Sequence, residues 1–302
     1  MPSFTKYGVL PVWAASGAFL LSKSDEVMPV QDASPQVIVA LAAGGVSSLY
    51  LLMKASMVFY DSDWMKKTAD FMRGFQGQEK RRGIKVDNWI DQYNDLQNDE
   101  KSDVKDRESN YAKLVNAYYE LATLFYEWGW GTSFHFAYRR PEENFHESIR
   151  RHEYYLAGRL GVPKGSKVLD VGCGIGGPMR NITRFTGCDV TGITINEYQV
   201  QRGNELCREM KLDHQCRSVQ GDFMKLPFED NSFDGVYAIE ATCHAPDRHG
   251  VYSEIMRVLK PGGVFACYEW CVTDKYDSNN PAHRKIKKQI EEGDGLPDMI
   301  HT

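Results

Sequence analysis

Residues 167–178, KVLDVGCGIGGP, decide the fold of this chain, because a short apolar run ends here in an acid and a cluster of glycines. The run has the aliphatic composition of a buried parallel strand. Glycines without Cβ atoms permit a sharp turn into the next helix, whose free N–H groups then face the same spot. The stretch therefore predicts a pocket for a nucleotide-like ligand, formed by Asp170, Gly172, Gly174, Gly176 and Gly177.

The identity of that ligand depends on where the acids lie. Three of the glycines also fit a dinucleotide fingerprint, but an NAD site would carry an acid about 20 positions further on, at the tip of the second strand. That strand, 188–193, is followed by Thr194, Ile195 and Asn196 instead. Asp170 before the glycines and Asp222, beside the aromatic Phe223, favour S-adenosylmethionine as the ligand. Glycines that serve only the turn remain the alternative.

The rest of the chain alternates strands and helices. We expect strands at 188–193, 215–219, 233–239 and 264–270, and helices at 196–210 and 247–259. With the first strand this gives a doubly wound, mostly parallel α/β sheet, in which ligands bind at the carboxyl ends of the strands. The loops after the first four strands should meet there.

Bulk composition excludes several functions. The net charge is −5, without a basic block, so no nucleic-acid partner is expected. The seven cysteines form no CxxC pair and the eight histidines show no ligand spacing, so we expect reduced thiols and no metal. Cys173, within the glycine turn, is interpreted as a small filler rather than a nucleophile.

The chain divides into three parts by composition. Residues 1–60 form an apolar extension in which 37–53 carry no charge, a length at the lower limit for a membrane span. We expect a membrane anchor or an interfacial segment there, the alternative being a buried or disordered extension. Residues 61–110 are highly charged and predict a helical linker. Residues 111–302 form the remaining domain.

Aromatic side chains are concentrated in the cap at 111–140. Nine of the twenty-one residues from 118 to 138 are aromatic. Helical spacing predicts a helix that runs up to the glycines at 129 and 131, where core packing explains most rings. The WGWG segment at 128–131 fits neither a helix nor a strand well, so we expect its rings to form a pocket wall or lid from irregular backbone.

Five stretches together resemble the sterol 24-C-methyltransferases of the S-adenosylmethionine-dependent methyltransferase superfamily. They are YEWGWGTSFHFA at 126–137, LDVGCGIGGPMR at 169–180, VTGITINEYQVQR at 190–202, IEATCHAPD at 239–247 and YEWCVTDKY at 268–276. The glycine motif is common to many methyltransferases, whereas the aromatic block and IEATCHAPD are specific. The resemblance covers about residues 111–300. Members of the family usually continue beyond GDGLPD, so the class I, Rossmann-like sheet is expected to be short of its C-terminal strands.

The resemblance implies methyl transfer to C24 of a sterol Δ24 double bond, cycloartenol-like or zymosterol-like. Attack by an alkene leaves a carbocation, which aromatic faces stabilise without bonding to it. The implied catalytic residues are Tyr126, Trp128 and Trp130, with Tyr119 as a weaker candidate, and Glu240 or His244 as the base that removes a proton. For Glu240 and His244, hydrogen bonds that hold the loop are an equal alternative. The implied cofactor residues are Asp170 with the glycines, Thr194, Asn196 and Gln199 in place of the ribose acid, and Asp222 with Phe223 at the adenine.

Two other functions stay open at this stage. One is methyl transfer to another lipid, and the other is a non-catalytic protein that binds S-adenosylmethionine. The expected partners are a sterol and a membrane, and a homo-oligomer is left open. The expected location is the endoplasmic reticulum membrane, with the catalytic domain facing the cytosol.

Overall fold

The computed structural model describes residues 86–301. The expected apolar extension at 1–60 and the first part of the charged segment lie outside the described residues. Within 86–301, no helix is both long enough and apolar enough to cross a membrane.

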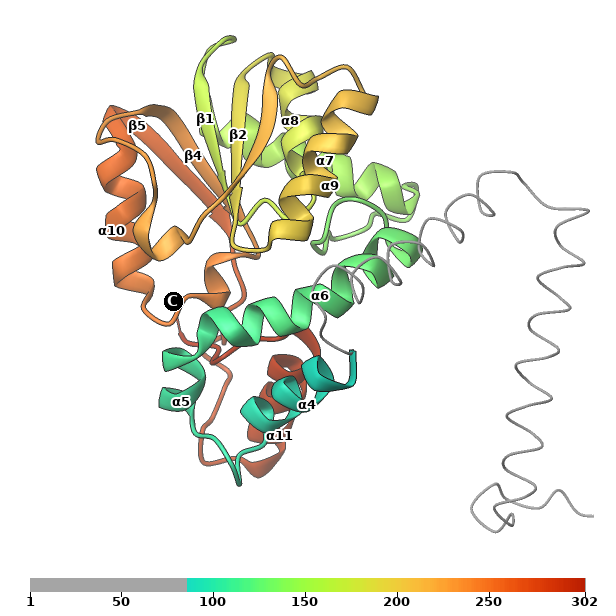
Figure 1. Cartoon of the computed structure of the whole chain (residues 1–302), viewed down its shortest axis with the longest axis vertical. Helices are drawn as coiled ribbons and strands as arrows, with labels where there is room; N and C mark the ends of the chain where they lie inside the picture. The colour runs from blue at the N-terminus through green and yellow to red at the C-terminus, as the bar shows by residue number, and fades with distance from the viewer. Residues whose placement is uncertain (1–85, 302) are drawn as a thin grey trace, which may run out of the picture. The chain divides into compact units, whose positions relative to one another are not determined.

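A five-stranded sheet forms the centre of the described chain (Figure 1), with the strands in the order β3-β2-β1-β4-β5 and every pair parallel. The expected doubly wound parallel sheet is therefore confirmed. The strands are β1 (Lys167–Val171), β2 (Asp189–Thr194), β3 (Cys216–Gln220), β4 (Phe233–Ile239) and β5 (Leu259–Tyr268).

The predicted boundaries differ most at β5. Leu259 already pairs with Phe233, five residues before the expected start at 264. The chain then makes an irregular turn through Gly262, which has a φ of +80°, and pairing resumes between Val264 and Gly235. The strand therefore begins before the KPGG turn and continues after it.

Helices cover both faces of the sheet. The helices α7 (Phe145–Leu160), α8 (Gly177–Thr186) and α9 (Glu197–Glu209) share one apolar core with one face, and α10 (Arg248–Val258) packs on the other (Figure 1). Alternate residues of β1 serve the two cores: Val168 points to the first, whereas Leu169 and Val171 point to the second. Short 3-10 turns follow β3 at Phe223–Lys225 and β4 at Thr242–His244.

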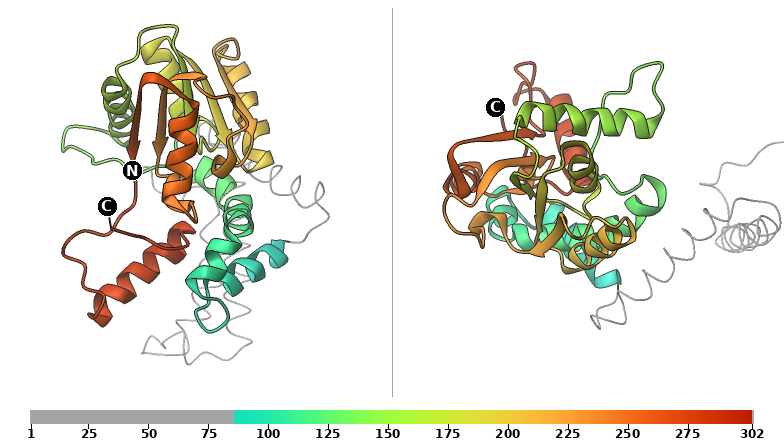
Figure 2. Two further views of the ribbon diagram at one scale, coloured as in Figure 1. Left: turned by 90° about the vertical axis from the view of Figure 1, so that its left-hand side faces the viewer. Right: turned by 90° about the horizontal axis from the view of Figure 1, so that it is seen from above.

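A second group of helices lies beyond the carboxyl ends of the strands (Figures 1 and 2): α4 (Val86–Gln97), α5 (Val104–Ser109), α6 (Tyr111–Gly129) and α11 (Pro281–Asp294). The described part of the expected linker thus forms two helices, which are hydrogen-bonded to the segment after α11. Gln97 Nε2 donates to the Leu296 carbonyl at 3.3 Å, and Arg107 Nε donates to the Pro297 carbonyl at 3.1 Å.

The last glycine of the motif has a packing role. A Cβ atom on Gly177 would lie 2.1 Å from the carbonyl oxygen of Thr132 and 2.4 Å from Ser133 Oγ. The segment 132–136 therefore rests directly on the first turn of α8. Gly174 has a related role, because the ring of Phe134 lies 3.4 Å from where its Cβ would be.

This contact predicts a marked difference between two Gly→Ala changes in neighbouring helices. Gly177→Ala should lower the free energy of unfolding by about 1–3 kcal/mol, because backbone atoms must move. Gly158→Ala, an exposed α7 position with nothing within 4 Å, should raise it by about 0.5–1 kcal/mol. Urea unfolding of both variants checks this. Equal effects would contradict the close approach of segment 132–136.

Candidate functional site

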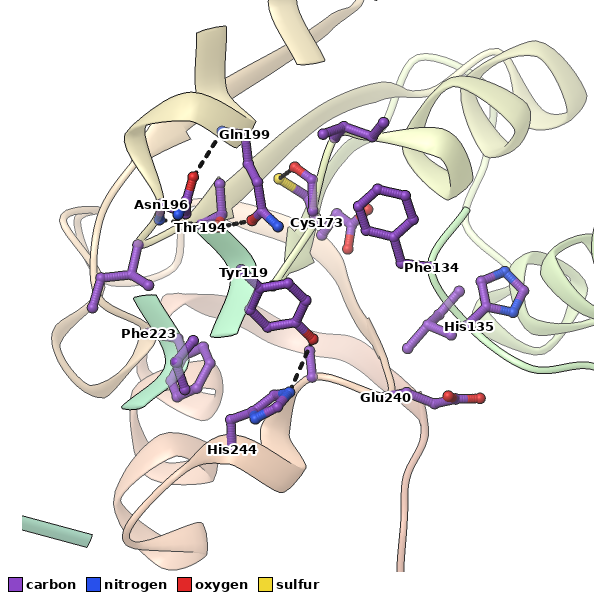
Figure 3. A pocket seen from close by; sticks show the side chains of 18 of the residues that line it. Tyr119, Phe134, His135, Cys173, Thr194, Asn196, Gln199, Phe223, Glu240 and His244 are labelled. Atoms are coloured by element: carbon purple, nitrogen blue, oxygen red, sulfur yellow. Dashed lines mark hydrogen bonds between the residues drawn. The ribbon is translucent and has the colours of Figure 1, made fainter. Parts of the chain in front are cut away.

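Of two neighbouring cavities in the described residues, the larger lies where the carboxyl ends of the strands meet α6. It encloses about 800 Å³, part of which is open to solvent. Its wall includes the glycine turn, the loops after β2, β3 and β4, and the first half of α6. Figure 3 shows side chains from all of these elements around one space. Of the ten predicted cofactor residues, eight line the cavity: Asp170, Gly172, Gly174, Thr194, Asn196, Gln199, Asp222 and Phe223.

Gly176 and Gly177 are the two that do not. Gly176 is the N-cap of α8 with a φ of +73°, and a Cβ there would meet the Met179 side chain at 2.7 Å. Gly177 carries the segment 132–136. The two glycines shape the turn and its packing and do not line the cavity, so their part in cofactor binding stays a prediction.

Asp170 is the buried acid at the centre of the cavity floor, and its side chain is 2% exposed. The Tyr237 hydroxyl donates a hydrogen bond of 2.9 Å to Asp170 Oδ2. Burial raises the pKa of Asp170 to about 7, although that hydrogen bond works in the opposite direction. A cationic or hydroxyl group of a ligand in the cavity would favour the ionised form of Asp170, which burial disfavours.

The loop after β2 is held by hydrogen bonds among its own side chains and to α6. Asn196 caps α9 by accepting from the Gln199 backbone N–H at 3.0 Å, and Thr194 Oγ1 lies 2.7 Å from Gln199 Oε1 (Figure 3). Gln199 Nε2 donates to Thr123 Oγ1 at 3.1 Å, which leaves little of the amide for a ligand. In this arrangement Gln199 mainly orients the loop, while Thr194 and Asn196 border the cavity.

The far end of the cavity carries the acid and ring expected at an adenine. Asp222 Oδ1 accepts from the Met224 N–H at 2.8 Å, which fixes the loop after β3. Phe223 faces Tyr111 of α6 in a stacked arrangement, with ring centroids 6.3 Å apart. Tyr111 carried no sequence signal of a place in the site, because the helical spacing around it predicted only the start of a packed helix.

A second cavity of about 450 Å³ adjoins the first. Five residues line both spaces, so the two cavities share part of their walls: Tyr119, Phe134, His135, Glu240 and His244. Aromatic side chains dominate the rest of its wall: Tyr118, Tyr126, Trp130, Phe136 and Trp270. Trp130 contacts Phe136 edge to face at 5.2 Å between ring centroids, and Phe136 contacts Trp270 in the same way at 5.6 Å. The predicted aromatic wall therefore exists for Tyr126 and Trp130.

Trp128 is not part of that wall. Helix α6 continues through Trp128 to Gly129, and irregular backbone begins only at Gly131, with a φ of +122°. Two residues along a helix turn a side chain by about 200°, so Trp128 faces away from Tyr126. Its side chain is 43% exposed. The expectation that Trp128 extends from irregular backbone is wrong, because Trp128 and Gly129 belong to the last turn of α6.

Glu240 follows β4 at the junction of the two cavities, in left-handed backbone with a φ of +52°. Its Oε1 accepts from the Phe136 N–H at 3.0 Å, and its Oε2 accepts from Trp270 Nε1 at 3.1 Å. Burial raises the pKa of Glu240 to about 7, against the effect of these two donors. A carboxyl group with such a pKa can accept a proton near neutral pH.

His244 is held in one tautomer. Its Nδ1 lies 3.1 Å from the Gly295 carbonyl, which can only accept, so Nδ1 carries the proton. Its Nε2 then accepts from the Tyr119 hydroxyl at 3.0 Å (Figure 3). Burial lowers the pKa of His244 to about 4, so the ring is neutral at pH 7. The hydrogen bonds of His244 fasten the loop after β4 to α6 and to the segment after α11.

Two acids near the cavities carried no sequence signal. Glu269, after β5, accepts from the N–H groups of Ala241, Thr242 and Cys243 at 2.7–3.0 Å and so shapes the loop after β4. Asp294, at the end of α11, lines the second cavity, where burial raises its pKa. Glu269 lies within the strand expected at 264–270, and neither residue has a local pattern that indicates its contacts.

Cys173 fills space, as expected. It is buried, and a Cβ on Gly192 would lie 2.6 Å from its sulfur. Burial raises the pKa of the Cys173 thiol, which makes it a poor nucleophile. All seven cysteines are free thiols in the structure.

A methyltransferase domain family model matches residues 169–267. Among solved structures, a putative sarcosine dimethylglycine methyltransferase from Galdieria sulphuraria is 30% identical, with a TM-score of 0.53, over 59% of this chain and 68% of that one. A geranyl diphosphate C-methyltransferase from Streptomyces coelicolor is 25% identical, with a TM-score of 0.54, over 64% and 75% of the two chains. These comparisons, together with the glycine turn, show that the chain belongs to the methyltransferase superfamily.

Curated relatives with higher sequence identity are sterol methyltransferases. The cycloartenol-C-24-methyltransferase of Arabidopsis thaliana is 61% identical over 198 residues, which are 66% of this chain and 59% of the relative. The sterol 24-C-methyltransferase of Saccharomyces cerevisiae is 56% identical over 196 residues, 65% of this chain and 51% of the relative. Over about two thirds of its length, the chain is similar to these sterol 24-C-methyltransferases. It spans between about half and two thirds of the length of the relatives it matches.

The raised pKa of Asp170 predicts how its replacement affects stability. The folded state holds the proton more tightly than the unfolded chain, so the Asp170 contribution to stability is lost as the pH rises from about 4 to about 7. Asp170→Asn still accepts from Tyr237 but cannot ionise. Between pH 4 and pH 8, the variant should therefore gain on the order of 1–3 kcal/mol relative to wild type, as measured by urea unfolding.

The control for this prediction is Asp234→Asn. The Lys260 hydrogen bond lowers the pKa of Asp234, so its stabilising contribution is fully present above the unfolded pKa of about 4 and is lost only at lower pH. The stability of this variant relative to wild type should therefore change little between pH 4 and pH 8. An equal gain in both variants would contradict the account of Asp170.

Proposed function

We propose that this protein transfers a methyl group from S-adenosylmethionine to C24 of a Δ24 sterol, through a carbocation that aromatic rings stabilise. The observation that supports this most strongly is the pair of neighbouring cavities. One has Asp170 before the glycine turn and Asp222 in the loop after β3, and the other has a wall of five aromatic side chains. The relatives named as sterol 24-C-methyltransferases support the choice of acceptor.

The residues of the larger cavity fit S-adenosylmethionine. Asp170 offers a buried carboxylate for the amino acid end or the ribose, and Asp222 with Phe223 offers an acceptor and a ring face for the adenine. When bound, the cofactor supplies a sulfonium methyl group, the electrophile of the reaction. The chain itself contributes the orientation of that group toward the Tyr119 and His244 boundary of the second cavity.

The second cavity fits an apolar acceptor that becomes a cation. Trp130 and Tyr126 present ring faces or edges to the space, and each desolvated ring that faces a cation contributes about 2 kcal/mol. The Tyr119 hydroxyl gives its hydrogen to His244, so its oxygen is left as an acceptor only. An oxygen in this state stabilises positive charge without forming a covalent bond.

Glu240 is the proposed base. It lies at the junction of the cavities, and the Phe136 and Trp270 donors hold its carboxyl group in place. His244 is less suited, because its Nε2 already accepts the Tyr119 hydroxyl and its pKa is about 4. A proton that leaves the carbocation therefore goes to Glu240, which restores a neutral product with a new carbon–carbon bond.

Because a base must be ionised to act, the turnover of the wild-type protein should fall as the pH decreases below about 7, where Glu240 becomes protonated. Measured kcat against pH gives the position of this limb, and Glu240→Gln should remove it and lower turnover strongly. A limb near pH 4 instead would assign the proton to His244 and contradict the role of Glu240.

The two tryptophans of the WGWG segment offer a matched pair. Trp130→Leu should lower kcat by roughly 30-fold, since it removes about 2 kcal/mol of cation stabilisation, with little change in cofactor affinity. Trp128→Leu, on the exposed face of α6, should stay within about twofold of wild type. Equal losses of turnover and cofactor affinity at Trp130 would make that residue structural.

Incubation of the full chain with labelled S-adenosylmethionine tests the proposed reaction. We expect label in cycloartenol or zymosterol and none in the matching sterol with a saturated side chain. Cofactor binding without transfer to either sterol would favour another lipid acceptor or a non-catalytic role.

We also propose that the protein associates with a membrane, because a sterol acceptor is a bilayer lipid. We place the protein at the endoplasmic reticulum membrane, with the described domain facing the cytosol. Flotation of the full chain with sterol-containing vesicles tests the association, and a protein that stays entirely in the dense fraction would contradict it.

A further inference from the structure

Glu153 lies in α7, outside both cavities, and is completely buried. A buried carboxylate is costly unless donors surround it. Ser133 Oγ donates to its Oε1 at 2.7 Å, His135 Nε2 lies 3.2 Å from the same oxygen, and Asn181 Nδ2 donates to its Oε2 at 2.7 Å. These partners come from segment 132–136 and from α8, so one carboxyl group joins three parts of the molecule.

His135 completes a chain of contacts that reaches the cavities. Its Nδ1 lies 3.0 Å from the Phe136 carbonyl, so both ring nitrogens face acceptors and the ring carries two protons. Burial alone would lower the pKa of His135, but the hydrogen bond and charge of Glu153 outweigh it and raise the pKa above its ordinary value. The neighbouring residue, Phe136, donates its N–H to Glu240.

We propose that Glu153 is a positioning residue that fixes segment 132–136 as the wall shared by the two cavities and thereby holds Glu240 at their junction. The evidence is the hydrogen-bonded sequence from Glu153 through His135 and the Phe136 peptide to Glu240. Its significance for catalysis rests on the proposed methyl transfer.

The charge of Glu153 has a second consequence for the wall. His135 borders both cavities, and an uncompensated imidazolium there would repel a carbocation and a sulfonium alike. The carboxylate of Glu153, which lies outside both cavities, balances the charge of the His135 imidazolium. The pair therefore supplies a rigid wall without a net charge beside the reacting atoms.

Hydrogen exchange of the full chain, without any ligand, tests the positioning directly. Glu153→Gln should accelerate exchange of the Phe136 amide by about 10-fold or more, while the amides of α7 and α8 remain protected. Glu142→Gln, an exposed change just before α7, is the matched control and should alter nothing. Unchanged exchange at Phe136 in Glu153→Gln, or equal acceleration throughout α7 and α8, would overturn the proposal.

Two further measurements complete the test. Ser133→Ala removes one hydrogen bond to Glu153 and leaves the ion pair with His135. It should therefore accelerate amide exchange less, and only within segment 132–136. This variant decides the question if Glu153→Gln fails to fold. In the methyl transfer assay, Glu153→Gln should lower kcat on the order of 10-fold to 100-fold, with the KM for the cofactor nearly unchanged. A parallel loss in both constants would contradict positioning.

The exchange result stands even where the assay fails. A wild-type chain that methylates no sterol refutes the proposed function, while exchange at Phe136 still decides whether Glu153 positions the wall.

Discussion

The contact between segment 132–136 and the glycine turn is the constraint on which the site depends. The Thr132 carbonyl approaches Gly177 so closely that no Cβ fits between them, and the Phe134 ring covers Gly174. Through this contact one stretch of backbone closes the cavity with the acids and forms the wall of the cavity with the rings. The motif that turns β1 into α8 therefore also sets the distance between the two spaces.

Burial and pairing set the charges of four titratable groups around that contact. Asp170 and Glu240 both have pKa values near 7 because burial disfavours their ionised forms. His244 is neutral, and His135 is paired with Glu153. The region where the cavities meet thus contains groups that can respond to a positive charge. Such a site suits a reaction in which a cation appears in an apolar space.

Local patterns predicted the sheet, because short stretches rich in apolar residues alternate with helical ones, and glycines directly follow β1 and β3. They also predicted that Asp170, near the end of β1, lies at the same edge of the sheet as Asp222 and Phe223, which follow β3. The backbone at Trp128 was expected to be irregular because Trp and Gly alternate there, whereas Trp128 and Gly129 form the last turn of α6. The roles of Glu153, Glu269 and Asp294 were not predicted, because they depend on contacts between segments that lie apart in the sequence.

The central claim is that donor and acceptor occupy adjoining cavities at the same time. A crystal structure of the full chain with S-adenosylhomocysteine and a Δ24 sterol tests it most directly. The account predicts the nucleoside between Asp170 and Phe223, and the sterol side chain against Trp130 and Tyr126, with the sulfur and C24 facing each other beside Tyr119. A nucleoside bound elsewhere, or a sterol excluded from the aromatic cavity while the cofactor site is filled, would contradict it.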